Sequence, residues 1–154
     1  FFVVELGTRR VVHVGTTRHP TDTWVAQQLR EATPFDQRPR YLIRDNDGPY
    51  SEFFKNRLRS MGIRDRPISP RSPWQNVHIE RLIGSLRREC LDHVMIFGER
   101  HLRRVLKSYS VYYNETRTHL GLDKDTPLPR PAQRSGTIVS VPILSGLHHC
   151  YART

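Results

Sequence analysis

The sequence lacks long apolar runs and a secretion signal, and it contains few cysteines. No stretch approaches the ~18–20 consecutive apolar residues that a membrane-spanning helix requires. The beginning, Phe1-Phe-Val-Val, has neither the positive charge nor the cleavage site of a signal peptide. The only cysteines, Cys90 and Cys150, are typical of reduced thiols in the cytosol. Membrane proteins and disulfide-rich secreted domains are therefore excluded, and a cytoplasmic protein is expected.

Acidic residues are also scarce in relation to basic ones. The 154 residues hold 25 Lys and Arg against 15 Asp and Glu, which gives a net charge of +10 and a pI near 10.4. Of the 25 basic residues only Lys55, Lys107 and Lys124 are lysines, and arginine suits bidentate contacts with phosphate. This excess favours nucleic acid as a partner. A basic surface without such a role, or a small ribosome-type binder, remains the alternative. The length suits one domain with its own core.

Two acidic positions stand out against this basic background. Asp45 follows the short apolar strand predicted at 41–44 and begins the turn sequence Asp45-Asn46-Asp47-Gly48. Glu80 stands near the start of a predicted basic helix. A carboxylate at a strand end and another near a helix start can converge on a divalent cation such as Mg²⁺, which prefers oxygen ligands. Taken alone, Glu80 could equally pair with Arg81 or Arg87, and Asp47 could simply hold the turn.

The helix that carries Glu80 has two distinct faces. Its apolar stripe is formed by Ile79, Leu82, Ile83, Leu86 and Cys90. Glu80, Gly84 and Arg87 or Arg88 share another face, one turn apart. The predicted start is a capping box of Ser72 and Gln75 with Pro73 in the first turn, or a cap at Asn76.

The order of these motifs resembles the catalytic core of the retroviral-integrase and insertion-sequence transposase superfamily, which carries an Asp, Asp, Glu triad. The resemblance rests on Asp45-Asn46 after an apolar strand and on Ser72-Pro73-x-Gln75-Asn76-x-x-x-Glu80-Arg81 before a basic helix. Between Asp45 and Glu80 lie 34 residues, close to the family's usual spacing. The segment Tyr113-Asn114-x-x-Arg117-x-His119, with Thr126-Pro127, matches the tail of such cores, so the resemblance covers about residues 1–132.

The resemblance implies an α/β, RNase H-like fold with a central mixed sheet flanked by helices. Residues 1–125 are expected to form this core, truncated at its N-terminus, and residues 126–154 a Pro-rich linker and tail with a short strand. The family's full fold begins with one further strand, which carries the first catalytic Asp. This strand would precede Phe1, and the chain is expected to lack it. Glu5 lies beside a hairpin turn, too far along its strand to replace that Asp.

The activity implied is DNA transposition or integration by metal-dependent strand transfer at transposon ends. Asp45 and Glu80 would be the catalytic and metal-binding residues, and Mg²⁺ or Mn²⁺ the cofactor, with two ions in the intact family site. DNA and further copies of the chain would be the partners, in the bacterial cytosol or nucleoid. Without the first Asp, this chain alone is expected to be inactive. The alternatives are a non-catalytic DNA-binding remnant or partner subunit, and an RNase H-like nuclease.

Residues near Glu80 are the candidate DNA contacts. The set comprises two groups, one in the loop before the helix and one on the helix itself: Trp74, Gln75, Asn76, Arg81, Arg87 and Arg88. Trp74 packing on its helix, and a merely solvated arginine face, are the alternatives. Arg117 and His119 are expected to anchor the chain after the last helix. His148-His149-Cys150 lacks a second ligand pair, so no zinc site is predicted there.

The remaining elements follow from periodicity and caps. We expect a hairpin of strands 1–6 and 10–14, turning at Gly7-Thr8 with Gly7 in a type II′ position and the first strand buried on both faces. Thr21 or Asp22 should cap a helix with Val25, Leu29 and Ala32 inward. The other predicted elements are a turn at Gly48-Pro49, a helix from Ser51 with Phe54, Leu58 and Met61 inward and Gly62 after its end, an edge strand at 63–68, a helix at 99–113 and a strand at 137–144.

Overall fold

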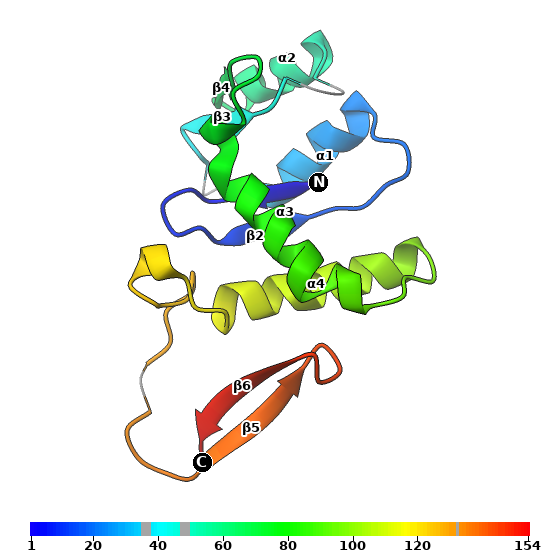
Figure 1. The fold of residues 1–154 in the computed structure, drawn as a ribbon. Coiled ribbons are helices and arrows are strands. Elements are labelled where there is room, and N and C mark those ends of the chain that lie inside the picture. Colours follow the sequence, from blue (N-terminus) through cyan, green and yellow to red (C-terminus); the bar gives the residue numbers. More distant parts are fainter. Residues whose placement is uncertain (35–37, 47–49, 132) are drawn as a thin grey trace.

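The computed structural model describes residues 1–34, 38–46, 50–131 and 133–154 (Figure 1). The elements, in chain order, are β1 (Phe2–Val4), β2 (Val11–Val14), α1 (Asp22–Ala32), β3 (Tyr41–Arg44), α2 (Glu52–Ser60), β4 (Arg64–Pro67), a 3₁₀ turn η1 (Pro73–Asn76), α3 (Val77–Glu89), η2 (Leu91–His93), α4 (Glu99–Glu115), η3 (Leu120–Leu122), β5 (Ile138–Ile143) and β6 (His148–Arg153). None of the helices in the described ranges is long and apolar enough to cross a membrane.

The strands form three two-stranded sheets. β1 pairs antiparallel with β2, β3 parallel with β4, and β5 antiparallel with β6. The α/β class is therefore confirmed. In the part of the chain described, the strands expected to form one central mixed sheet form two separate two-stranded sheets, β1–β2 and β3–β4. Within the described residues, β1 is hydrogen-bonded to β2 and β3 to β4, and no ladder joins the two pairs.

Two apolar clusters hold the helices in place. One joins α1, α2 and the residue before β4 through Val25, Leu29, Phe54, Leu58 and Ile63. The other joins β2, α3 and α4, and its buried members are Val11, Leu82, Leu86, Cys90, Val105, Leu106, Tyr109 and Tyr113. In Figure 1 the β1–β2 hairpin lies between α1 and α3. The hairpin thus separates the two clusters, with helices on both of its faces, as an α/β layered fold requires.

The positions of α1, β3 and α2 agree with those predicted from capping residues and apolar periodicity. The Thr21 hydroxyl accepts a hydrogen bond from the Trp24 amide, and Ser51 does the same for Phe53, so both predicted N-caps are confirmed. Gly62 follows α2 with φ +72°, a left-handed conformation that glycine adopts without steric cost. β3 has its predicted bounds, and β4 is a short strand within 63–68.

The first hairpin differs from its prediction. Its strands are shorter, with an irregularity between Val3 and Val4, and the left-handed residue in the turn is Arg9 (φ 62°) rather than Gly7. β1 is half-buried instead of buried on both faces. Glu5 is engaged in the turn, where it accepts a hydrogen bond from the Thr8 hydroxyl and lies 3.5 Å from Arg10 Nε.

The start of α3 agrees with the prediction in position but not in its hydrogen bonds: Ser72 and Pro73 begin the 3₁₀ turn η1, and Asn76 is the N-cap residue of α3. Neither Ser72 nor Asn76 makes a side-chain cap, since the Gln75 amide group turns to Ser69 instead and the capping box does not form. Ile83, which was predicted to belong to the apolar stripe of α3, is exposed, whereas the polar Ser85 is buried. The buried face of α3 therefore differs from the stripe that its apolar residues predict.

The C-terminal strand prediction was incomplete. β5 was expected, but it forms a hairpin with β6, whose sequence His-His-Cys-Tyr-Ala-Arg lacks a clear alternation of apolar residues. The predicted turn at Gly48-Pro49 and the turn residue Asp47 lie outside the described residues. The predicted division at 125/126 stays a prediction.

Candidate functional site

Asp45 lies directly after β3, and its side chain is exposed to solvent. Its polar neighbour is the Tyr50 hydroxyl. Burial of Tyr50, and then the charge and hydrogen bond of Asp45, raise the pKa of this tyrosine to about 12. The tyrosine therefore stays protonated at neutral pH and acts as a hydrogen-bond donor to the Asp45 carboxylate.

The backbone of Asp45 is held by Arg44, the last residue of β3. The buried Arg44 guanidinium binds Asp65 of β4 in a bidentate way, with Nε–Oδ1 3.0 Å and Nη2–Oδ2 2.8 Å. Its third nitrogen, Nη1, donates to the carbonyl oxygen of Asp45 at 2.9 Å, and the guanidinium lies 4.4 Å from the centre of the Tyr50 ring. Arg44, Asp65 and Tyr50 thus position Asp45. None of the three was a candidate from the sequence, although an arginine at an inward position of a short strand signals a buried carboxylate partner.

Hydrogen bonds connect this strand end to the start of α3. The Asn46 side chain donates to the Ile68 carbonyl oxygen at 2.6 Å. The next residue, Ser69, donates its amide proton to Gln75 Oε1 at 2.8 Å. The segment leading into α3 is therefore fixed to the turn after β3, and Figure 1 draws the beginning of α3 beside β3 and β4. Asn46 and Gln75, both singled out from the sequence, meet the same short loop.

Glu80 stands in the first turn of α3, with its side chain exposed. Within the described parts of the chain, neither Glu80 nor Asp45 forms an ion pair with a lysine, arginine or histidine. The alternative pairing of Glu80 with Arg81 or Arg87 is therefore not found. Both carboxylates are exposed, and the loop at Ile68 and Ser69 connects the turn after β3 with the segment that leads into α3.

The donor set for a metal is small. Over the described ranges, no group of three or more His, Cys, Asp or Glu side chains gathers in a way that could hold an ion. Asp45 and Glu80 supply two carboxylates, which can hold one hard cation together with water. They do not supply the bridging ligand that a pair of ions requires. The binding of Mg²⁺ or Mn²⁺ by Asp45 and Glu80 stays a prediction.

The candidate DNA contacts surround the start and outer face of α3. Trp74 is 69% exposed, so it does not pack on the helix as the alternative proposed. Arg81, Arg87 and Arg88 are exposed, as is Gln75, while Asn76 is half-buried. A Cβ atom at Gly84 would lie 3.1 Å from Arg88 Nη1, so the absence of a side chain lets the arginine lie along the helix. Their roles in DNA binding stay predictions.

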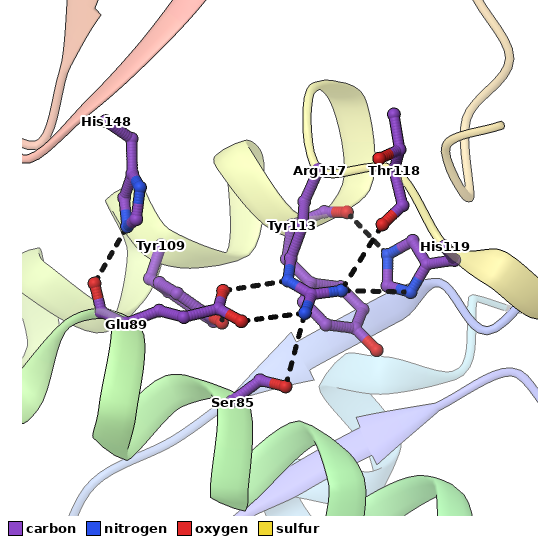
Figure 2. Close-up of polar contacts among 8 residues, drawn as sticks. All are labelled: Ser85, Glu89, Tyr109, Tyr113, Arg117, Thr118, His119 and His148. Carbon is purple, nitrogen blue, oxygen red and sulfur yellow. Dashed lines mark hydrogen bonds and ion pairs between the residues drawn. The ribbon is translucent and has the colours of Figure 1, made fainter. Parts of the chain in front are cut away.

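The opposite end of α3 is held by an ion pair (Figure 2). Arg117 donates from Nε to Glu89 Oε2 at 2.8 Å and from Nη2 to Glu89 Oε1 at 2.7 Å, and the Tyr109 hydroxyl donates to the same carboxylate at 3.1 Å. Burial would raise the pKa of Glu89, but the hydrogen bonds and charge of Arg117 outweigh it and lower that pKa. The bond with Glu89 in turn raises the pKa of Arg117. The predicted anchoring role of Arg117 is confirmed, and its partner Glu89 was missed.

Two histidines complete this network. His119 is buried against the Tyr113 ring, and burial followed by the charge of Arg117 lowers its pKa. His148 of β6 donates from Nε2 to the Glu89 carbonyl oxygen at 2.8 Å and stacks on Tyr112 at 4.2 Å between ring centres. The tail that follows α4 and the C-terminal hairpin are both attached to the end of α3 in this way (Figure 2).

Comparison with known proteins gives a family match and two insertion-element relatives. Residues 61–127 match the family model described as "Integrase core domain". The chain is 29% identical over 126 residues to the "Insertion element IS476 uncharacterized 39.2 kDa protein" of Xanthomonas euvesicatoria, covering 81% of this chain and 36% of that protein. It is 29% identical over 139 residues to the "Insertion element IS407 uncharacterized 31.7 kDa protein" of Burkholderia multivorans, covering 88% and 49%. The chain thus spans half or less of these relatives.

Among solved structures, the chain is similar to one in the cryo-EM structure of the simian T-cell lymphotropic virus intasome in complex with the PP2A regulatory subunit B56 gamma. The TM-score is 0.63 at 18% sequence identity, over 97% of this chain and 58% of that chain. This likeness confirms the RNase H-like fold class. The match at residues 61–127, which begins before the Glu80 helix and ends at Pro127, shows that this part of the chain is similar to an integrase core domain, and the chain is also similar to two proteins of insertion elements.

Proposed function

We propose that this chain acts on DNA as part of a protein of transposition or integration, with Asp45 and Glu80 as the carboxylates that hold a divalent cation against a DNA phosphate. The observation that carries the proposal is the link between the two elements, from Asn46 through Ile68 and Ser69 to Gln75. It ties an exposed carboxylate after β3 to a helix whose first turn carries another.

The chemistry follows from the residues present. Mg²⁺ or Mn²⁺, when bound, would polarise a phosphodiester and offset charge that develops on its oxygens. The Tyr50 hydroxyl is a hydrogen-bond donor to Asp45, and Arg44 donates to the Asp45 carbonyl oxygen. Trp74, Gln75, Arg81, Arg87 and Arg88 would hold the DNA backbone beside the cation.

Strand transfer needs more than these residues supply. Two carboxylates do not hold a pair of ions, so we expect DNA and metal binding by this chain without efficient strand transfer. The complete reaction would take place in a longer protein and in a homo-multimer on paired transposon ends. In this proposal residues 1–125 form the core, and residues 126–154 a linker and tail.

A second candidate function is DNA binding without catalysis. The charge of +10 and the small donor set support it equally well. The two proposals differ on metal, because a binding remnant has no need for Asp45 and Glu80 to share a cation.

The test is paramagnetic broadening of backbone amide signals by Mn²⁺. We expect the signals near Asp45 and Glu80 to broaden together, and either Asp45→Asn or Glu80→Gln to remove the effect at both sites. Asp92→Asn and Glu115→Gln are matched controls, since both carboxylates are exposed and lie in η2 and at the end of α4, not beside β3 or in the first turn of α3. They should leave the broadening near Asp45 and Glu80 unchanged. If each variant removes broadening only at its own position, the carboxylates do not share an ion, and the binding remnant is the better description.

A further inference from the structure

The outer face of the β3–β4 sheet gathers three arginines around one exposed tyrosine. Arg40, Arg66 and Arg64 have their guanidinium carbons 5.3, 5.4 and 5.9 Å from the centre of the Tyr41 ring. Tyr41 is paired with Arg64 in the parallel register, and Ile43 with Arg66. Because side chains alternate along a strand, Tyr41, Arg64 and Arg66 share one face of the sheet, and the guanidinium of Arg40, the residue before β3, reaches the same ring. We call Arg40, Tyr41, Arg64 and Arg66 the β3–β4 patch.

The opposite face of the same two strands is the buried one. It carries Leu42 and Arg44 from β3 and Asp65 from β4, and the Asp65 carboxylate is fully engaged by Arg44 there. The one acidic residue on β4 is therefore turned away from the patch. In the described residues, no ion pair joins Arg40, Arg64 or Arg66 to a carboxylate.

This gathering of charge is unfavourable in the isolated protein. The three guanidinium groups surround one ring, so they lie within about a Debye length (~10 Å at 0.1 M salt) of one another, and salt screens their repulsion incompletely. The contacts with the Tyr41 ring are weak at an exposed site, so they offset this repulsion only in part. A solvated arginine face would spread its charges apart, whereas a polyanion would stabilise all three at once.

We propose that the β3–β4 patch is a second DNA contact, which binds the phosphate backbone of a duplex through Arg40, Arg64 and Arg66 while Tyr41 holds them together. The proposal rests on the proposed function, since it assumes that DNA is the ligand. It adds a surface on a different element from the α3 residues. Arginine forks suit phosphate oxygens, and the contact carries no base preference.

The position of the patch is compatible with one continuous duplex. Tyr41 and Asp45 are four residues apart at the two ends of β3, which corresponds to roughly 13 Å at ~3.3 Å per residue. A DNA strand has one charge per ~3.4 Å of helix axis, so the distance spans about four base pairs. A duplex with a phosphate at Asp45 therefore has further phosphates within reach of the patch.

The test is the salt dependence of binding of the whole chain to a fluorescent duplex of random sequence. Each phosphate contact contributes about 0.9 to the slope of log K against log salt concentration. We expect the triple variant Arg40→Gln, Arg64→Gln, Arg66→Gln to make this slope less steep by about 2 to 3. The matched control is Arg30→Gln, Arg57→Gln, Arg100→Gln, which removes the same charge from exposed positions on α1, α2 and α4, and should change the slope by less than about 1.

The outcomes separate this proposal from the one it rests on. Equal slopes for the patch variant and its control would overturn the patch as a contact. A third variant, Arg81→Gln with Arg87→Gln and Arg88→Gln, reports on α3, and if it alone flattens the slope, DNA binding stands and the patch falls. Wild-type chain that fails to bind duplex at low salt would overturn both. All substituted arginines are exposed, so folding should persist, and thermal unfolding of each variant checks it.

Discussion

The ion pair between Glu89 and Arg117 should contribute measurably to the stability of the fold. It is bidentate, its side chains are only 26% and 24% exposed, and Tyr109 donates to the same carboxylate. Hydrogen bonds to charged groups contribute about 1.5–3 kcal/mol each when one partner is removed, and partial exposure reduces this. We therefore expect Arg117→Ala to lower the free energy of unfolding by about 2–3 kcal/mol, and the melting temperature by about 4–10 °C.

A double-mutant cycle isolates the interaction. Arg117→Ala, Glu89→Gln and the double variant are compared by urea unfolding, and the coupling energy should be about 2 kcal/mol. The control is the pair Glu99–Arg103, which has a single Nη2–Oε1 contact at 2.8 Å and side chains 43% and 53% exposed. Its coupling should be about 0.3–0.5 kcal/mol. If the two couplings are equal, burial does not strengthen the Glu89 pair and the reasoning fails.

Two further changes test the charges inside the fold. Arg44→Gln should lower the free energy of unfolding, measured in urea, by about 2–4 kcal/mol, because it leaves Asp65 without its partner. The control is Arg59→Gln, which removes an exposed partner of Glu52 and should lower it by less than about 0.5 kcal/mol. Equal losses would show that Arg44 does not stabilise the end of β3. Stability should also fall on acidification. The pKa values of His119 and Glu89 are both lowered in the folded chain, so unfolded chain binds protons first, below the ordinary values of 6.5 and 4.5 respectively. Urea unfolding between pH 7.5 and 3.5 should show the loss, His119→Gln should remove its upper part, and a flat profile would contradict both assignments.

Elements set by neighbouring residues were predictable from the sequence. Thr21 and Ser51 cap their helices because the hydrogen bond is formed within three residues, and Gly62 ends α2 for an equally local reason. The bounds of β3 follow from a short apolar run that ends in turn residues. In each of these cases the information lies within a few positions of the element itself.

Features that depend on distant partners were not predictable. Gln75 was assigned to a capping box, but it contacts Ser69, whose position depends on the parallel pairing of β3 and β4. The Arg44–Asp65 pair joins residues 21 apart, and the Glu89–Arg117 pair residues 28 apart. Periodicity gives the identity of a charged residue and its face, whereas its partner follows only from strand register and helix packing.

The position of Asp45 shows how the two kinds of information combine. Asp45 and Asp65 both lie on or beside the β3–β4 sheet, yet only Asp65 is neutralised, because Arg44 points inward and binds it. Asp45 is left with a neutral donor, the Tyr50 hydroxyl, as its polar neighbour. Carboxylates that bind metals are commonly held by such a donor, which orients one oxygen and leaves the other free. Arg44 is thus paired with Asp65, whereas Asp45, the carboxylate that the sequence motif singles out, has no ion-pair partner among the described residues and is exposed to solvent, as the proposed cation site requires.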